Sequence, residues 1–161
     1  MEEILEILEK NSKYTVEEIA KMTGKTENEV KSAIKEYEDK NVIAGYSALI
    51  NWEMTSKETV LALIEVKITP QRGEGFDKVA ERIYKFPEVK SCYLMSGGFD
   101  LTVIIEGKTM KEVALFVPEK LAVQEYVLST STHFVLKKYK DKGTIFKEKP
   151  EDDREVTFIW N

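Results

Sequence analysis

Hydrophobic positions in the first forty residues recur at the spacing of short helices. Apolar side chains gather within residues 4–8, 16–22 and 30–37, and the last of these groups follows i, i+3, i+4, i+7. That spacing places side chains on one face of a helix. Each segment is too short to be stable alone, because isolated helices below about 12–15 residues are marginal in water. We therefore expect three helices that pack on one another.

Two of these helices carry clear start signals. Thr15 is followed three residues later by Glu18, and Thr26 by Glu29. This is the pattern of a capping box, in which a hydroxyl and a carboxylate satisfy the first backbone amides of a helix. Gly24 lies where a left-handed residue can end the second helix without steric strain. Two helices joined by so tight a turn indicate a helix-turn-helix.

The pattern changes after Asn41, which is expected to end the third helix. Residues 42–50 read as an extended segment and residues 52–59 as a connector without periodicity. Beyond them, strand-like alternation and helical spacing take turns. The expected elements are a strand over 60–68, a helix from 76 that ends before Pro87, strands over 89–95 and 101–105, a helix opened by a capping box at Thr109 and Glu112 and kinked or ended at Pro118, and a strand over 130–136.

The order β-α-β-β-α-β is typical of a ferredoxin-like sandwich, in which two helices cover one face of a four-stranded antiparallel sheet. Leu61, Leu63 and Ile104 fall on the other face by alternation. A sheet that is apolar on both faces but covered on one needs a second covering surface. We therefore expect at least a dimer.

Composition excludes several classes of protein. The 161 residues hold 24 Lys and Arg against 29 Asp and Glu, for a net charge of −5, and 33% are charged. No apolar run approaches the roughly 20 residues of a membrane span. A lone Cys92 and a lone His133 cannot form a disulfide or the usual zinc sites, so we expect neither metal nor cofactor. The acidic N-terminus lacks a secretory signal, which favours the cytoplasm.

Seven short strings occur in one order over residues 1–140. They are ILEIL at 4–8, EIAKMTG at 18–24, VKSAIK at 30–35, VIAGY at 42–46, PEV at 87–89, GGFDL at 97–101 and VLSTSTHFVL at 127–136. Together they resemble the landmarks of the leucine-responsive regulator/AsnC (Lrp/AsnC) family, also called feast/famine regulators. The resemblance implies an α+β protein, with an N-terminal winged-type helix-turn-helix followed by a ferredoxin-like βαββαβ sandwich, the RAM-type domain.

The resemblance also implies a function: a transcriptional regulator that binds double-stranded DNA and responds to an amino acid or similar metabolite. Its sandwich domains would pair into homodimers that close into octamers. The implied division is a DNA-binding domain over 1–45, a strand and linker over 46–58, an effector-binding and oligomerisation domain over 59–140 and a C-terminal extension over 141–161. The implied DNA-binding residues are Lys25, Thr26, Asn28, Lys31, Ser32 and Lys35. The implied effector-binding residues are Gly97, Gly98, Phe99, Asp100, Thr130 and Thr132.

The chemistry of the effector set suits a zwitterion. Backbone amides at the two glycines can receive a carboxylate, the Asp100 carboxylate can receive an ammonium, and threonine hydroxyls can do either. The chain departs from the family where Ala33 replaces a common Arg, where Glu36 replaces a basic residue and where Gly98 replaces an acid. Residues 1–45 hold seven lysines against eleven acids, and 7 − 11 gives −4.

Other readings stay open at this point. The glycines could form an ordinary hairpin turn, and Asp100 could satisfy its amides. The acidic N-terminal segment could be a three-helix interaction module, which would make the protein a metabolite sensor without DNA binding. A siroheme decarboxylase-like enzyme on the same fold is a further alternative, although one His and three Arg are few for a poly-carboxylate tetrapyrrole. The final run Val156–Trp160 is either an added strand or a docking segment.

Overall fold

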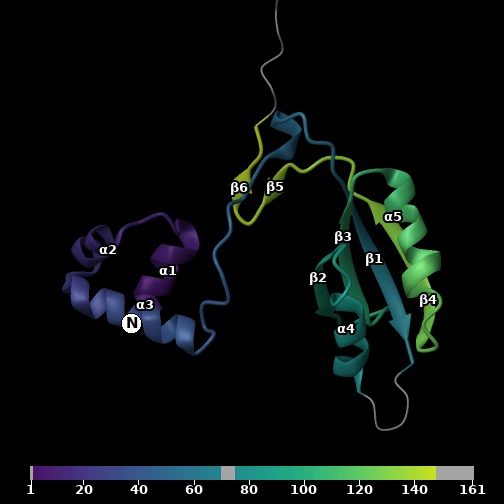
Figure 1. Ribbon diagram of the computed structural model, residues 1–161, viewed down its shortest axis with the longest axis horizontal. Coiled ribbons are helices and arrows are strands. Elements are labelled where there is room, and N and C mark those ends of the chain that lie inside the picture. The colour runs from purple at the N-terminus through teal and green to yellow at the C-terminus, as the bar shows by residue number, and fades with distance from the viewer. Residues whose placement is uncertain (1, 70–74, 148–161) are drawn as a thin grey trace, which may run out of the picture. The chain divides into compact units, whose positions relative to one another are not determined.

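The computed structural model describes residues 2–69 and 75–147 (Figure 1). The chain divides into an N-terminal unit, Met1–Leu49, and a C-terminal unit, Ile50–Asn161. Each unit has its own buried apolar cluster. The final run over 156–160 lies outside the described residues.

The N-terminal unit consists of three helices, α1 (Glu2–Lys10), α2 (Val16–Thr23) and α3 (Glu27–Asp39). Each helix contributes to one small core, so none depends on its own stability alone. The predicted trihelical arrangement is confirmed. The buried residues of this core are Ile4, Ile19, Ala20, Val30 and Ala33.

The predicted helix boundaries of this unit are also confirmed. The Thr15 hydroxyl accepts a hydrogen bond from the Glu18 amide at 3.2 Å, and the Glu18 carboxylate accepts one from the Thr15 amide at 2.8 Å. Gly24 ends α2 with φ 66, the left-handed conformation that favours glycine. Asn41 follows α3 with φ 56, so an asparagine takes the same role there.

The C-terminal unit contains one sheet of four strands and a small two-stranded sheet. Its elements are η1 (Trp52–Met54), β1 (Val60–Ile68), α4 (Phe76–Tyr84), β2 (Val89–Leu94), β3 (Leu101–Gly107), α5 (Met110–Phe116), η2 (Val117–Leu121), β4 (Val127–Phe134), β5 (Lys140–Asp141) and β6 (Thr144–Ile145).

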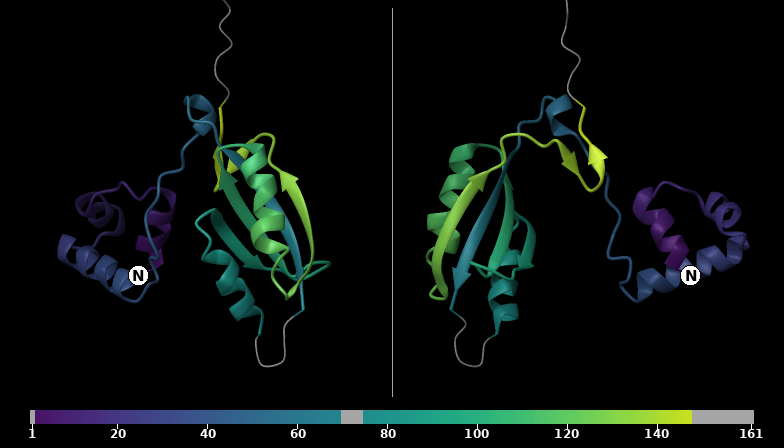
Figure 2. Two further views of the ribbon diagram at one scale, coloured as in Figure 1. Left: turned by 45° about the vertical axis from the view of Figure 1, so that its right-hand side comes forward. Right: turned by 180° about the vertical axis from the view of Figure 1, so that it is seen from behind.

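The four strands are antiparallel in the order β2-β3-β1-β4, as a ferredoxin-like sandwich requires. Helices α4 and α5 cover one face of this sheet (Figure 2). Alternate residues of β1, namely Ala62, Ile64 and Val66, are fully buried beneath them. Fully burying a side chain such as Ile64 contributes roughly 1.5–3 kcal/mol. This core holds both edges of the sheet in register.

Two predicted elements differ in detail. Strand β4 begins at Val127 and ends at Phe134, so Leu136, which is 91% exposed, lies beyond it. The capping box expected at α5 is incomplete, because the Glu112 carboxylate accepts from the Lys108 amide instead of the Thr109 amide. The Thr109 hydroxyl still caps the helix by accepting from the Glu112 amide at 3.1 Å.

The proline effect on α5 is as predicted. The helix ends at Phe116, and a π-helical turn, η2, continues through Pro118. The Ala122 amide donates to the Val117 carbonyl at 2.8 Å, which closes the wider turn. Proline has no amide to donate, so a regular α-helical ladder cannot pass through it.

Candidate functional site

Helix α3 has one apolar face and one polar face. Val30 and Ala33 are 0% and 2% exposed within the core. Four of the six predicted DNA-binding residues lie on the exposed face at the spacing i, i+3, i+4, i+7. They are Asn28, Lys31, Ser32 and Lys35. The structure therefore gathers these four side chains on one continuous helix surface.

The other two predicted DNA-binding residues lie at the start of the helix. Lys25 is half-buried, and Thr26 caps α3. The Thr26 hydroxyl accepts from the Glu29 amide at 3.3 Å and donates to the Glu29 carboxylate at 2.7 Å. The Glu29 carboxylate accepts hydrogen bonds from the Thr26 amide and from the Thr26 hydroxyl, and these two bonds lower the pKa of Glu29. Both hydrogen-bonding roles of this hydroxyl are thus used in forming the helix.

The charges on α3 are separated along its length. Lys40 at the C-terminal end pairs with Glu36 at 2.5 Å, which raises the pKa of Lys40. Within residues 2–69 and 75–147, neither Lys31 nor Lys35 forms an ion pair. Their ammonium groups are therefore available to phosphate, even though the unit as a whole is acidic.

Ala33 stands where the resembled family commonly has an arginine. It is 2% exposed and packs in the core of the three helices. A long charged side chain there would bury its charge or open the core. The small residue is therefore a packing requirement of this chain.

The predicted effector residues Gly97, Gly98, Phe99 and Asp100 form the turn between β2 and β3. Gly97 has φ 139, which a residue with a side chain rarely adopts. Gly98 has no positive φ, and a Cβ at either glycine would meet no atom within 4 Å. Both glycines are exposed, whereas Phe99 and Asp100 are half-buried. The turn itself requires a glycine only at position 97.

Asp100 holds this turn against the central strand β1. Its Oδ2 accepts from the Ile68 amide at 2.8 Å, and its own amide donates to the Val66 carbonyl at 3.1 Å. The Asp100 carbonyl accepts from the Met95 amide at 2.8 Å. One carboxylate oxygen thus has a structural role, because it satisfies a strand-end amide. The sequence alone gave no signal for the partnership with Ile68, which is 32 residues away.

Thr130 and Thr132 lie on edge strand β4, Thr130 near the end of β1 that Asp100 contacts and Thr132 opposite the middle of β1. In the register of the sheet Thr130 pairs with Val66 and Thr132 with Ile64. Opposite residues of an antiparallel pair share a face, so both threonines lie on the helix-covered side, where they are half-buried. Asp100, in the turn before β3, and Thr130, on β4, therefore both lie beside Val66.

The open face of the sheet carries Leu61, Leu63 and Ile104, all half-buried. His133 lies on this face, opposite to Thr132 as alternation predicts, with its Nε2 atom 3.4 Å from Glu65 Oε1. The Ser131 hydroxyl lies 3.3 Å from the same nitrogen. A Ser-His-acid relay needs the hydroxyl and the carboxylate on different ring nitrogens, so these three residues do not form one.

The described part of the chain contains no helix long and apolar enough to cross a membrane. Nor do the residues from 2 to 69 and from 75 to 147 bring three or more His, Cys, Asp or Glu side chains together as metal ligands. Cys92 is half-buried on β2, and burial raises the pKa of its thiol, which disfavours the reactive thiolate.

Comparison with known protein families matches both units. Residues 61–145 match the Lrp/AsnC ligand binding domain, and residues 2–44 match a winged helix-turn-helix DNA-binding domain. The chain belongs to the Lrp/AsnC family. Like other members, it is a helix-turn-helix transcriptional regulator with a ligand-binding domain.

Individual transcriptional regulators match the chain over most of their length. The chain is 54% identical to the uncharacterized HTH-type transcriptional regulator YugG of Bacillus subtilis, covering 96% of this chain and 93% of that protein. It is 32% identical to HTH-type transcriptional regulator FL11 of Pyrococcus furiosus, covering 86% and 88%. The crystal structure of the transcriptional regulator NMB0573/L-Met complex from Neisseria meningitidis matches with a TM-score of 0.69, 26% identity and coverage of 90% and 92%.

Proposed function

We propose that this Lrp/AsnC protein binds specific DNA sequences through the exposed face of α3. The observation that carries the proposal is the alignment of Asn28, Lys31, Ser32 and Lys35 on one helix surface, opposite a buried apolar face. An exposed recognition helix in the major groove uses such side chains for base edges and phosphates. With a net charge of −4 over residues 1–45, binding depends on a few aimed contacts instead of bulk charge.

The proposed effector is an amino acid, held near Asp100, Thr130 and the glycine turn. Asp100 uses one carboxylate oxygen for the Ile68 amide, which fixes the side chain and leaves the second oxygen for an ammonium group. The open space around Gly97 and Gly98 leaves room for a carboxylate to reach backbone amides. The L-Met complex of the Neisseria relative makes L-methionine a reasonable first probe.

A second copy of the chain is the proposed cover for the open sheet face. Leu61, Leu63 and Ile104 give that face an apolar centre, and Glu65 beside His133 gives it complementary polar groups. Around a twofold axis, the same patch meets itself, so each carboxylate can approach an imidazole of the other copy. Assembly of such dimers into octamers would place two readers at a fixed separation on DNA.

The proposal treats the protein as a regulator and not as an enzyme, located in the cytoplasm. Its relatives are transcriptional regulators, and the Ser131, His133 and Glu65 cluster lacks relay geometry. Siroheme is therefore not the expected ligand, and a sensor without DNA binding is the less favoured alternative.

The test is a gel-shift assay with the DNA upstream of the protein's own gene, at low salt. The full-length chain is expected to form a discrete complex at micromolar protein, and a Lys31→Ala/Lys35→Ala double variant is expected to lose it. Lys90→Ala, an exposed lysine on β2, is the matched control and should bind normally. No discrete complex with the unmodified chain, or equal loss in both variants, would refute the proposed interface.

Effector binding is tested separately by calorimetric titration with L-methionine and other amino acids. Asp100→Asn keeps an oxygen that can accept the Ile68 amide but removes the negative charge, so it should fold and bind the amino acid at least about tenfold more weakly. Amino-acid binding that is indifferent to this substitution would place the effector elsewhere.

A further inference from the structure

A cavity of about 430 Å³ lies in the C-terminal unit, apart from the glycine turn. Its lining includes Thr59, directly before β1, and Gly107, at the end of β3. The turn at Gly97 and Gly98 instead precedes the start of β3. The cavity is therefore at the opposite end of the sheet from Asp100, and it has the volume typical of small-molecule sites, about 300–1,000 Å³.

The floor of this cavity is apolar. Ile105 from β3 and Val113 and Phe116 from α5 line it, with exposed fractions of 1%, 2% and 3% in the chain as a whole. These residues belong to the core, so the floor is rigid and already formed. A ligand that fits must present hydrocarbon to this floor.

The rim is acidic. Five glutamates and three lysines line the cavity, and two of the lysines are engaged. Lys120 pairs with Glu88, which lowers the pKa of Glu88, and the Lys57 ammonium lies 4.0 Å from the centre of the Trp52 ring. With every charge counted, five carboxylates against three ammonium groups leave the lining negative. The field in the cavity therefore favours a cation.

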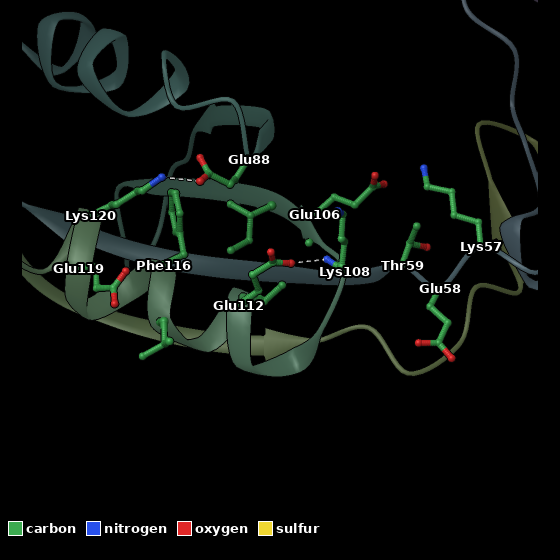
Figure 3. Close-up of a pocket in the computed structure, with 14 residues that line it drawn as sticks. Lys57, Glu58, Thr59, Glu88, Glu106, Lys108, Glu112, Phe116, Glu119 and Lys120 are labelled. Atoms are coloured by element: carbon green, nitrogen blue, oxygen red, sulfur yellow. Dashed lines mark hydrogen bonds and ion pairs between the residues drawn. The ribbon is translucent and has the colours of Figure 1, made fainter.

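Four of the five lining glutamates have no cationic partner among the described residues. Within residues 2–69 and 75–147, no ion pair involves Glu58, Glu106, Glu112 or Glu119. Figure 3 shows Glu119 at one end of the cavity and Glu58 at the other, with Phe116 and Glu106 between these ends. Carboxylates therefore lie at both ends of the cavity and also between them, around the apolar floor.

We propose that this cavity binds a small aliphatic diamine. The two ammonium groups would pair with carboxylates of the rim that have no ion pair, Glu58 and Glu106 among them, and the methylene chain would lie over the apolar floor. A dicarboxylate would meet repulsion at both ends, and a zwitterion at one. Because Glu58 belongs to the connector before β1 and Glu106 to β3, a bound diamine joins the connector to the sheet.

The test is calorimetric titration of the full-length chain with 1,5-diaminopentane. One diamine should bind per chain, and added salt should weaken binding because the pairing is electrostatic. Glu58→Gln and Glu106→Gln should each weaken binding about tenfold, the loss typical of one charge-assisted contact. Glu125→Gln removes the same charge at an exposed position away from the cavity and should leave the affinity unchanged. Glutarate and 1,5-pentanediol should not compete.

Three results would overturn the proposal. The first is the absence of saturable diamine binding at millimolar concentration. The second is diamine binding that is unaffected by Glu58→Gln and Glu106→Gln. The third is binding of glutarate with the same affinity as the diamine. None of these results bears on DNA binding or on amino-acid binding at Asp100, so the two proposals fail independently. Circular dichroism of each variant shows whether it is folded, and the conservative Gln substitutions at exposed or half-buried positions should preserve the fold.

Discussion

Replacing Asp100 with alanine removes the acceptor of the Ile68 amide at the end of β1. Ile68 is 5% exposed and its amide donates to Asp100 Oδ2 at 2.8 Å. A buried donor left without a partner lowers the free energy of unfolding by about 1–3 kcal/mol. Because Asp100 is only half-buried, we expect a loss in the lower part of this range, about 1–2 kcal/mol. For a domain of this size that corresponds to a fall in Tm of about 4–8 °C per kcal/mol. Asp100→Asn retains an acceptor oxygen and should cost less than about 1 kcal/mol.

Amide hydrogen exchange measured by NMR tests this reasoning most locally. Exchange of the Ile68 amide should quicken strongly in Asp100→Ala and little in Asp100→Asn, while thermal unfolding gives the global loss. If the alanine variant protects Ile68 as well as the unmodified chain does, the contact has no structural role. If the two variants are equally destabilised, charge and not hydrogen-bond acceptance explains the role of Asp100.

Thr26→Ala should lower the free energy of unfolding of the N-terminal unit by about 1 kcal/mol, as loss of a helix cap does, and urea titration followed by circular dichroism measures this. The pKa of Glu29 lies below its ordinary value of 4.5, so its contribution to stability is present above that pH and is lost as pH falls through the folded pKa. Acid titration should therefore destabilise this unit below about pH 4.5, and a Glu29→Gln variant should be less sensitive to acid; equal sensitivity would contradict the assignment. Gly107→Ala should destabilise the C-terminal unit by about 1–3 kcal/mol, because its Cβ would lie 2.9 Å from Val113 Cγ2. Gly98→Ala, which meets nothing within 4 Å, is the control that should keep the melting temperature.

The fold was largely predictable because local signals agree with the packing. The helix caps at Thr15 and Thr26, the helix end at Gly24 and the alternation of β1 are all local features, because each is decided by residues close in the sequence. The structure has each of them at the predicted position. The end of β4 was placed too late because Leu136 continues the alternation but has no partner strand opposite it. Pairing, and not pattern, decides where a strand ends.

The candidate sites were less predictable, since they depend on contacts between distant segments. The exposed face of α3 follows from helical periodicity alone, but the bond from Ile68 to Asp100 joins residues with no common pattern. The buried position of Ala33 likewise follows from its place in the apolar i, i+3, i+4, i+7 group. The cavity beside Phe116 is lined by residues of the connector, β3 and α5. No pattern within a single segment predicts it.

The most direct test of the proposed DNA interface is the salt dependence of binding to the upstream DNA, measured by fluorescence anisotropy. Each phosphate contact contributes about −0.9 to the slope of log K against log salt. Lys31→Ala and Lys35→Ala should each reduce the magnitude of the slope by about one, while Lys90→Ala should leave it unchanged. If both α3 variants keep the full slope and affinity, α3 does not contact DNA through these lysines, and the proposed reader surface is wrong.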